Sequence, residues 1–231
     1  MRVAVVTVGD ELLAGETVNT NAAWLGDQLA ERGVTVERVT VVPDRIADIA
    51  RVVNEYHADY DAVIVTGGLG PTHDDVTVDG VAAAFGREVV ESEEALAWLE
   101  EEGGYAREDL TDGTGDVPEG SRVLPNHEGV APGCVVENCY VLPGVPAEMK
   151  RMFAAVAEEF SGEQTHVVTV DADEPESALL DRLADVQERF PVKVGSYPGD
   201  HVTVRFESPD ETVAEDAAAW LRERVEQPDE E

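Results

Sequence analysis

The segment from residue 61 to residue 77, DAVIVTGGLGPTHDDVT, constrains the fold more than any other part of the sequence. It begins with a short run of β-branched residues, which is typical of a buried parallel strand. The run breaks into Gly67, Gly68 and Gly70, and we expect these glycines to adopt backbone conformations that other residues avoid. Asp74 and Asp75 follow, and then a helix-like pattern begins. The segment therefore predicts a strand, a tight turn and a helix N-terminus in direct succession.

The chemistry of this turn has two interpretations. Free backbone N–H groups point outward at a helix N-terminus, so the glycines and Thr72 indicate a phosphate site. The adjacent carboxylates of Asp74 and Asp75 would repel a phosphate unless a divalent cation lay between them, and oxygen ligands of this kind suit Mg²⁺. The alternative is a β–α turn whose acidic residues only cap the helix. The local residues leave both interpretations open.

The pattern around this segment predicts an α/β fold. Strand-like runs at residues 2–8 and 34–42 alternate with helical patterns that follow Asn19 and Pro43. This alternation predicts a three-layer, doubly wound, mostly parallel sheet with right-handed crossovers. Ligands of such sheets bind beyond the carboxyl ends of the strands. The loops at residues 9–15, 43–44 and 67–75 meet that description.

The rest of the chain predicts further loops and a second domain. Residues 103–120 are rich in Gly, Asp, Glu and Thr, and we expect a surface excursion there. A polar loop that contains Asn126 and Gly129 precedes two short strands, and a Pro-Gly entry at Gly144 opens a helix. After Gly162 the order is β-α-β-β-α. The sequence thus predicts one domain over residues 1–162 and a small α+β domain over residues 163–231.

The net charge of −34, with 50 acidic residues against 16 basic ones, excludes some partners. Such a surface repels nucleic acid and anionic membranes, so we expect neither as a partner. Molar salt would screen these charges, and the composition is typical of a halophile. We find no signal peptide and no apolar run near membrane-spanning length, which predicts a cytoplasmic protein. Cys134 and Cys139 lack further Cys or clustered His and are expected to be buried or half-buried thiols.

Several motifs together resemble a known family. The run GGLGPTHDDVT resembles the signature GG-x-GP-x-x-x-D-x-T of the MoaB/Mog-like domain of molybdenum cofactor biosynthesis. With GDELLAG, NTN, NHEGVAPG and LPGVPAEM in the same order, the chain is more similar to the N-terminal region of the competence/damage-inducible protein A (CinA) family. The tail resembles the small KH-like domain of that family. RNA binding is not expected there, because the tail has little basic surface.

The resemblance implies three possible activities. CinA-like proteins of this layout are associated with metal-dependent pyrophosphatase activity on ADP-ribose-type nucleotides, and related domains of FAD synthases with hydrolysis of FAD. The Mog branch adenylylates molybdopterin with Mg²⁺ and ATP, and its two functional aspartates fall on Asp44 and Asp75. A non-catalytic ligand-binding protein is the third. Leu69, where the Mog pattern has Thr, and the extra Asp74 favour the hydrolase.

These observations define a candidate site. We expect Asp44 and Asp75 to be catalytic, with a divalent cation, Mg²⁺ or another, held by Asp44, Asp74 and Asp75 and activating a water molecule. K⁺ is a further candidate cofactor. The expected ligand is a nucleotide or a pterin phosphate, and the relatives' assembly into dimers or trimers implies a homo-oligomer. His73 and His127 are acid–base candidates or solvated side chains. The expected ligand-binding residues are Gly67, Gly68, Gly70, Thr72, Asn126, Gly129 and Gly144.

Overall fold

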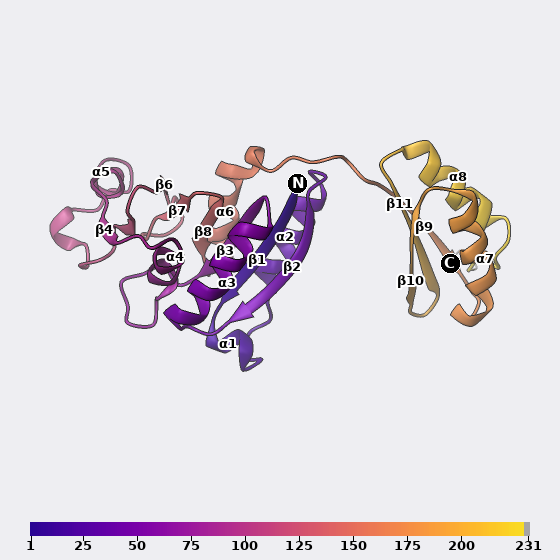
Figure 1. Ribbon diagram of the computed structural model, residues 1–231, viewed down its shortest axis with the longest axis horizontal. Helices are drawn as coiled ribbons and strands as arrows, with labels where there is room; N and C mark the ends of the chain where they lie inside the picture. Colours follow the sequence, from indigo (N-terminus) through magenta and orange to yellow (C-terminus); the bar gives the residue numbers. More distant parts are fainter. Residues whose placement is uncertain (229–231) are drawn as a thin grey trace. The chain divides into compact units, whose positions relative to one another are not determined.

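The computed structural model describes residues 1–228, and the last three residues of the expected small domain lie outside the described residues (Figure 1). Contacts divide the chain into two compact units, Met1–Gly162 and a second unit that begins at Glu163. Among residues 1–228, we find no helix with the length and apolar character that a membrane crossing requires.

The first unit is built on a six-stranded sheet of order β2-β1-β3-β8-β7-β6. Four neighbouring strands run parallel, and β7 and β6 continue the sheet antiparallel. The central strands are almost entirely buried because their side chains are apolar on both faces. The mixed, mostly parallel sheet confirms the predicted fold. Its strands are β1 Arg2–Val8, β2 Thr35–Val42, β3 Ala62–Gly67, β6 Arg122–Leu124, β7 Gly133–Val136 and β8 Cys139–Pro143.

Helices cover both faces of this sheet, which makes three layers (Figure 1). Val3 and Val5 of β1 pack with α2 and α6 on one face, whereas Ala4 and Val6 pack with α3 and α4 on the other. This alternation follows from the two-residue period of a strand. The helices of the unit are α1 Asp10–Leu13, α2 Thr20–Ala30, α3 Ile46–Asp59, α4 Thr77–Phe85, α5 Glu93–Glu101 and α6 Pro146–Val156, with the 3₁₀ turns η1 Arg107–Asp109 and η2 Ala157–Glu159.

The segment at residues 103–120 differs from its prediction. It ends in a strand, β5 Asp116–Pro118, which pairs antiparallel with β4 Val89–Glu91. Val117 joins the core on the α3 and α4 side of the sheet, and Thr114 is also buried. The expectation of a surface excursion is therefore wrong for this part, because one apolar side chain among polar neighbours anchors the segment to the sheet.

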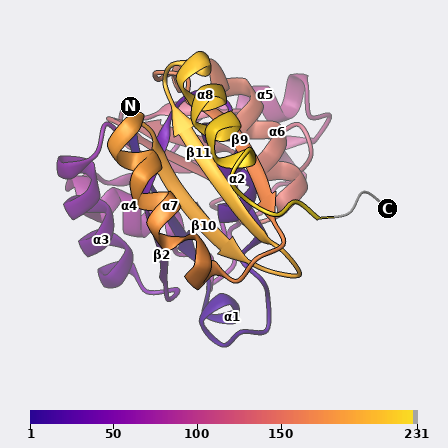
Figure 2. The same cartoon turned by 90° about the vertical axis from the view of Figure 1, so that its right-hand side faces the viewer.

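The second unit has the predicted β-α-β-β-α order. Its antiparallel sheet has the order β10-β11-β9, and Figure 2 shows α7 and α8 lying across one face of it. Phe206, Leu179 and Leu221 are fully buried between these layers. The elements are β9 His166–Ala172, α7 Glu176–Arg189, β10 Lys193–Pro198, β11 Val202–Ser208 and α8 Glu211–Arg222.

Candidate functional site

The carboxyl ends of β1, β2, β3 and β8 meet at one edge of the first unit's sheet. The loop after β1 lies against the loop after β2, since the Asp10 N–H donates to Asp44 Oδ2 at 2.8 Å. The chain after β8 lies close to the end of β3, since a Cβ built on Gly144 would be 3.4 Å from the Gly67 carbonyl carbon. The predicted loops therefore form one contiguous edge.

The glycine turn after β3 wraps around the Asp75 carboxylate. A Cβ on Gly68 would overlap Asp75 Oδ1, and a Cβ on Gly70 would lie 2.7 Å from Asp75 Oδ2. A Cβ on Gly67 would overlap Thr77 Oγ1. None of these three glycines has a φ in the left-handed region between +20° and +160°, so the structure does not support the conformational reason that was expected for them. Close approach of side chains, and not an unusual backbone conformation, requires glycine here.

Thr72 connects the two aspartates of the turn. Its hydroxyl donates to Asp74 Oδ1 at 2.7 Å and also to Asp75 Oδ2, and its N–H lies 3.3 Å from the same Asp75 oxygen. The hydroxyl of Thr72 lowers the pKa of Asp74 because it stabilises the charged carboxylate. Asp75 is thus fixed by the turn that carries it.

The environment of Asp44 is acidic. Burial raises the pKa of this carboxyl, and the nearby charges of Asp10, Glu11 and Asp74 raise it further, against the opposing effect of the Asp10 N–H. A group of like charges without a counter-charge is the electrostatic condition that a bound cation relieves.

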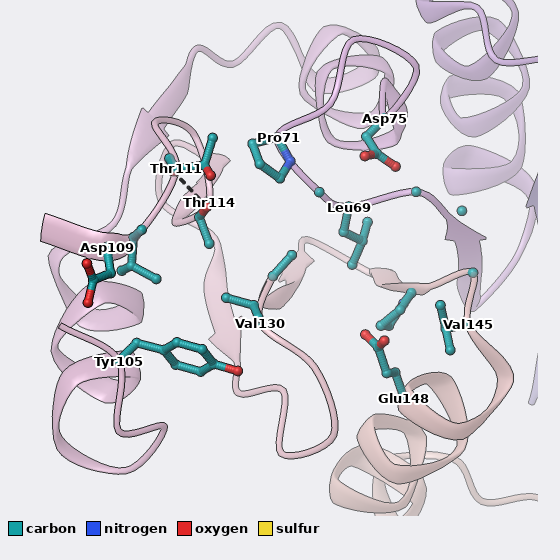
Figure 3. Close-up of a pocket in the computed structure, with 17 residues that line it drawn as sticks. Leu69, Pro71, Asp75, Tyr105, Asp109, Thr111, Thr114, Val130, Val145 and Glu148 are labelled. Carbon is teal, nitrogen blue, oxygen red and sulfur yellow. Dashed lines mark hydrogen bonds between the residues drawn. The ribbon is translucent and has the colours of Figure 1, made fainter. Parts of the chain in front are cut away.

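A cavity of about 540 Å³ opens beside the glycine turn (Figure 3). This volume is within the range of small-molecule sites. The predicted residues that line it are Gly67, Gly68, Gly70, Asp75 and Gly144. The N–H groups of Gly68, Leu69 and Gly70 donate to no backbone acceptor in the described chain, and N–H groups without such a partner are the kind that bind anions.

The charges in the cavity are of one sign. Its 17 lining residues include three carboxylates, Asp75, Asp109 and Glu148, and no lysine, arginine or histidine. The remaining side chains are mainly apolar, among them Leu69, Val130 and Val145. An anionic ligand would therefore be neutralised here by backbone N–H groups and a cation, and not by basic side chains.

One wall of the cavity comes from the segment that the sequence indicated as a surface excursion. Tyr105, Asp109 and Thr111 lie on this wall, and Thr114 Oγ1 donates to the Thr111 carbonyl oxygen at 2.7 Å (Figure 3). Sequence reasoning missed these residues because a Gly- and Asp-rich composition is also typical of solvated loops. The signals were the aromatic Tyr105 and the apolar Leu110 and Val117 inside a polar run.

Glu148, on the α6 side of the cavity, was also missed. Asn126 Nδ2 donates to Glu148 Oε2 at 2.7 Å, and Asn126 is only 2% exposed. The same amide donates to the Ala131 carbonyl oxygen at 3.0 Å and accepts from the Gly129 N–H at 2.9 Å. A Cβ on Gly129 would overlap Glu148 Oε2, so the loop needs glycine to approach the carboxylate. Asn126 and Gly129 therefore lie against the Oε2 side of the Glu148 carboxylate.

The other predicted residues lie outside this cavity. Thr72 lines a smaller neighbouring cavity that shares Asp75, whereas Asp44 and Asp74 line neither of the two. The His73 side chain is 98% exposed, which fits a solvated residue. His127 packs edge-on against Trp98, with ring centroids 5.2 Å apart.

The carboxylates do not form a complete metal cage. Within residues 1–228, no three His, Cys, Asp or Glu side chains converge in an arrangement that could hold a metal ion. Mg²⁺ does not require such a cage, because it commonly binds one or two carboxylates together with water and substrate phosphates. The charge of Asp74 acts on Asp44, and Thr72 links Asp74 to Asp75, so these carboxylates supply the oxygen donors that shared coordination of the expected ion needs.

Comparison with family models divides the chain at the same boundary as the contacts do. Residues 4–162 match the family described as a probable molybdopterin binding domain. Residues 164–229 match the family of the FAD synthase middle domain. For the second unit this match is what the comparison supports.

Individual proteins are also similar to this chain over most of its length. A protein of Archaeoglobus fulgidus is 38% identical, over 96% of this chain and 97% of its own length. A CinA-like protein of Citrifermentans bemidjiense is 39% identical over 97% of this chain, which spans 58% of that longer relative. Among solved structures, CinA from Thermoplasma acidophilum, described as a protein of unknown function, is similar with a TM-score of 0.63 and 38% identity. That similarity covers 69% of this chain and 97% of the other.

Proposed function

Because this chain belongs to the CinA-like family of proteins with a probable molybdopterin binding domain, we propose that it is a divalent-metal-dependent pyrophosphatase of ADP-ribose-type or FAD-like nucleotides. The reaction adds water across a P–O–P bond. With ADP-ribose it releases AMP and ribose 5-phosphate.

One observation carries this proposal. A glycine turn whose Gly68, Leu69 and Gly70 N–H groups donate to no backbone acceptor lines a cavity whose charged side chains, in the described chain, are all carboxylates. The N–H groups suit a phosphate, whereas the carboxylates oppose it unless a cation is present. A pyrophosphate bound together with a divalent cation suits the N–H groups and also neutralises the carboxylates.

The residues have distinct roles in this proposal. The N–H groups of Gly68, Leu69 and Gly70 hold phosphate oxygens at the end of β3. Asp75, fixed by Thr72, and Asp44 at the end of β2 would hold the cation, with Asp74 as a further candidate ligand. When bound, the divalent cation supplies charge neutralisation and lowers the pKa of water. The apolar wall excludes bulk water from the rest of the nucleotide.

Product analysis tests the proposal. The purified chain, in molar KCl with Mg²⁺, would be offered ADP-ribose and FAD, and release of AMP would be measured with and without a chelator. We expect AMP release that requires the metal and is lost in Asp75→Asn and Asp44→Asn. Asp27→Asn is the matched control, because Asp27 is exposed on α2 and lines none of the cavities described above. Full activity of Asp75→Asn would remove Asp75 from the site.

Adenylyl transfer to molybdopterin is the second candidate. The apolar side chains of the cavity, such as Leu69 and Val145, favour a flat heterocycle equally well. In the same assay, pyrophosphate released only when ATP and molybdopterin are both present would support this candidate instead. Binding of these compounds without any turnover would support a ligand-binding protein.

A further inference from the structure

Glu148 is a carboxylate that the proposed phosphate and metal chemistry does not use. It lies in the first turn of α6, on the opposite side of the cavity from Asp75, with Leu69 between them (Figure 3). Asp75 is fixed by the glycine turn, and Glu148 is fixed by the loop that contains Asn126. The two carboxylates therefore face a ligand from different directions.

The surroundings of Glu148 show what it can bind. Among the described residues it forms no ion pair, and its side-chain partner is the neutral amide of Asn126. That amide has its donors and its oxygen occupied by Glu148, Ala131, Glu128 and Gly129. One Glu148 oxygen is held, and the carboxylate keeps further acceptor capacity toward the cavity.

An ionised carboxylate can only accept hydrogen bonds, and a pyrophosphate at neutral pH has no donor to offer. Glu148 must therefore meet the part of a ligand that is not phosphate. With phosphate at the glycine turn and the cation on the Asp75 side, the sugar of a nucleotide would extend toward Glu148. A ribose presents two adjacent hydroxyl groups, which can donate to one carboxylate.

We propose that Glu148 is a specificity-determining residue that accepts hydrogen bonds from the vicinal hydroxyl groups of a ribose in the bound nucleotide. Asn126 is the positioning residue that holds the carboxylate in place. This inference rests on the proposed function, because it takes the ligand to be an ADP-ribose-type pyrophosphate.

Glu148→Gln is the variant that tests it. Glutamine keeps the length of the side chain, and its oxygen can still accept from Asn126, so the loop remains anchored. The group that faces the cavity changes from a charged acceptor to an amide donor. Glu158→Gln is the matched control, because it removes the same charge from an exposed position just beyond α6.

Calorimetric binding in molar KCl with Mg²⁺ would use four non-hydrolysable probes. The complete probe is methylene-bridged ADP-ribose. Two deoxygenated probes lack the vicinal hydroxyls of either the adenosine ribose or the terminal ribose. The fourth probe, methylenediphosphonate, has no sugar. We expect Glu148→Gln to weaken the complete probe at least about tenfold, since hydrogen bonds to charged groups are strong. Methylenediphosphonate should bind unchanged or more tightly, because a negative charge has been removed.

The deoxygenated probes identify the ribose. The deoxygenated probe that lacks the hydroxyls facing Glu148 should bind the wild type and Glu148→Gln equally. The other deoxygenated probe should bind Glu148→Gln more weakly than the wild type, as the complete probe does. Glu158→Gln should leave all four affinities unchanged. Equal weakening of every probe, or no weakening of the complete one, would overturn the proposal. So would a lower kcat for ADP-ribose with unchanged binding, which would make Glu148 part of the reaction.

The failure of this inference differs from the failure of the proposed function. If the wild type binds the complete probe but does not hydrolyse ADP-ribose, the hydrolase is refuted and the same affinities still decide the role of Glu148. If the wild type binds none of the sugar-containing probes, both proposals fail.

Discussion

Replacing Gly68 with alanine should displace the Asp75 carboxylate. The new Cβ would overlap Asp75 Oδ1 and lie 2.9 Å from Asp75 Cγ. Because non-bonded carbon atoms pack at about 3.5 to 4.0 Å, the carboxylate must move by roughly 1 Å. That movement weakens the hydrogen bonds from Thr72 and takes the cation ligand away from the phosphate site. A displacement of this size costs on the order of 100-fold in turnover.

The assay is metal-dependent AMP release from ADP-ribose, measured together with thermal unfolding. We expect a loss of stability of only about 1 to 2 kcal/mol, because the broken hydrogen bonds lie near the surface. Gly26→Ala is the matched control: its Cβ meets nothing within 4 Å in the middle of α2. It should raise stability by about 0.5 to 1 kcal/mol and leave AMP release unchanged.

A double variant decides whether the loss acts through Asp75. If Gly68→Ala works only by displacing that carboxylate, adding it to Asp75→Asn should cause no further loss, since both changes remove one function. Turnover close to the wild-type rate in Gly68→Ala, or losses that add in the double variant, would refute the reasoning.

Two further predictions concern ionisable groups away from the cavity. The Arg182 guanidinium lowers the pKa of Glu174 from 4.5 to about 2, so their ion pair stabilises the second unit fully above about pH 4.5 and less as pH falls toward 2. Glu174→Gln should reduce stability near neutral pH by about 1 to 2 kcal/mol and flatten this acid dependence in urea titrations; an unchanged acid dependence would contradict it. Burial raises the pKa of Cys134 to about 12 and that of Cys139 well above its ordinary value, so both thiols should resist iodoacetamide at mildly alkaline pH until urea unfolds the chain. Mass spectrometry measures the labelling, and modification of the native protein would show that the sheet opens at these strands.

The features that the sequence predicted well have local causes. The runs of β1 and β3 contain mainly apolar and β-branched residues, so their burial follows from composition alone. Asn19 precedes its helix and accepts from the Ala22 N–H at 3.1 Å, which is the capping interaction that the residue type indicates. The positions of Gly67–Gly70 and Gly144 followed from the rule that ligands bind beyond the carboxyl ends of parallel strands.

The features that were missed depend on distant partners. Glu148 in the first turn of a helix resembles an ordinary helix-stabilising residue, and its partner Asn126 lies 22 positions earlier in the chain. The wall at residues 105–114 is held by the short pairing of β4 with β5 and by the burial of Val117. A sequence pattern shows which residues are compatible with a loop, but not which loop a distant strand will hold against the site.

The two sides of the cavity differ in the structures that support them. The glycine turn continues from β3, a fully buried strand with a neighbour on each side. The segment with Tyr105 and Thr111 is supported by η1 and by two strands of three residues each. Local opening requires less free energy where few buried contacts are broken, so amide hydrogens at residues 103–115 should exchange faster than those of β3. A ligand that touches both sides immobilises the weaker one, and the entropy lost in that step lowers its affinity. The cavity therefore has a rigid side at the glycine turn and a more flexible side at residues 103–115. Slower amide exchange at residues 103–115 would report that the cavity is occupied by any ligand, including one that is never turned over.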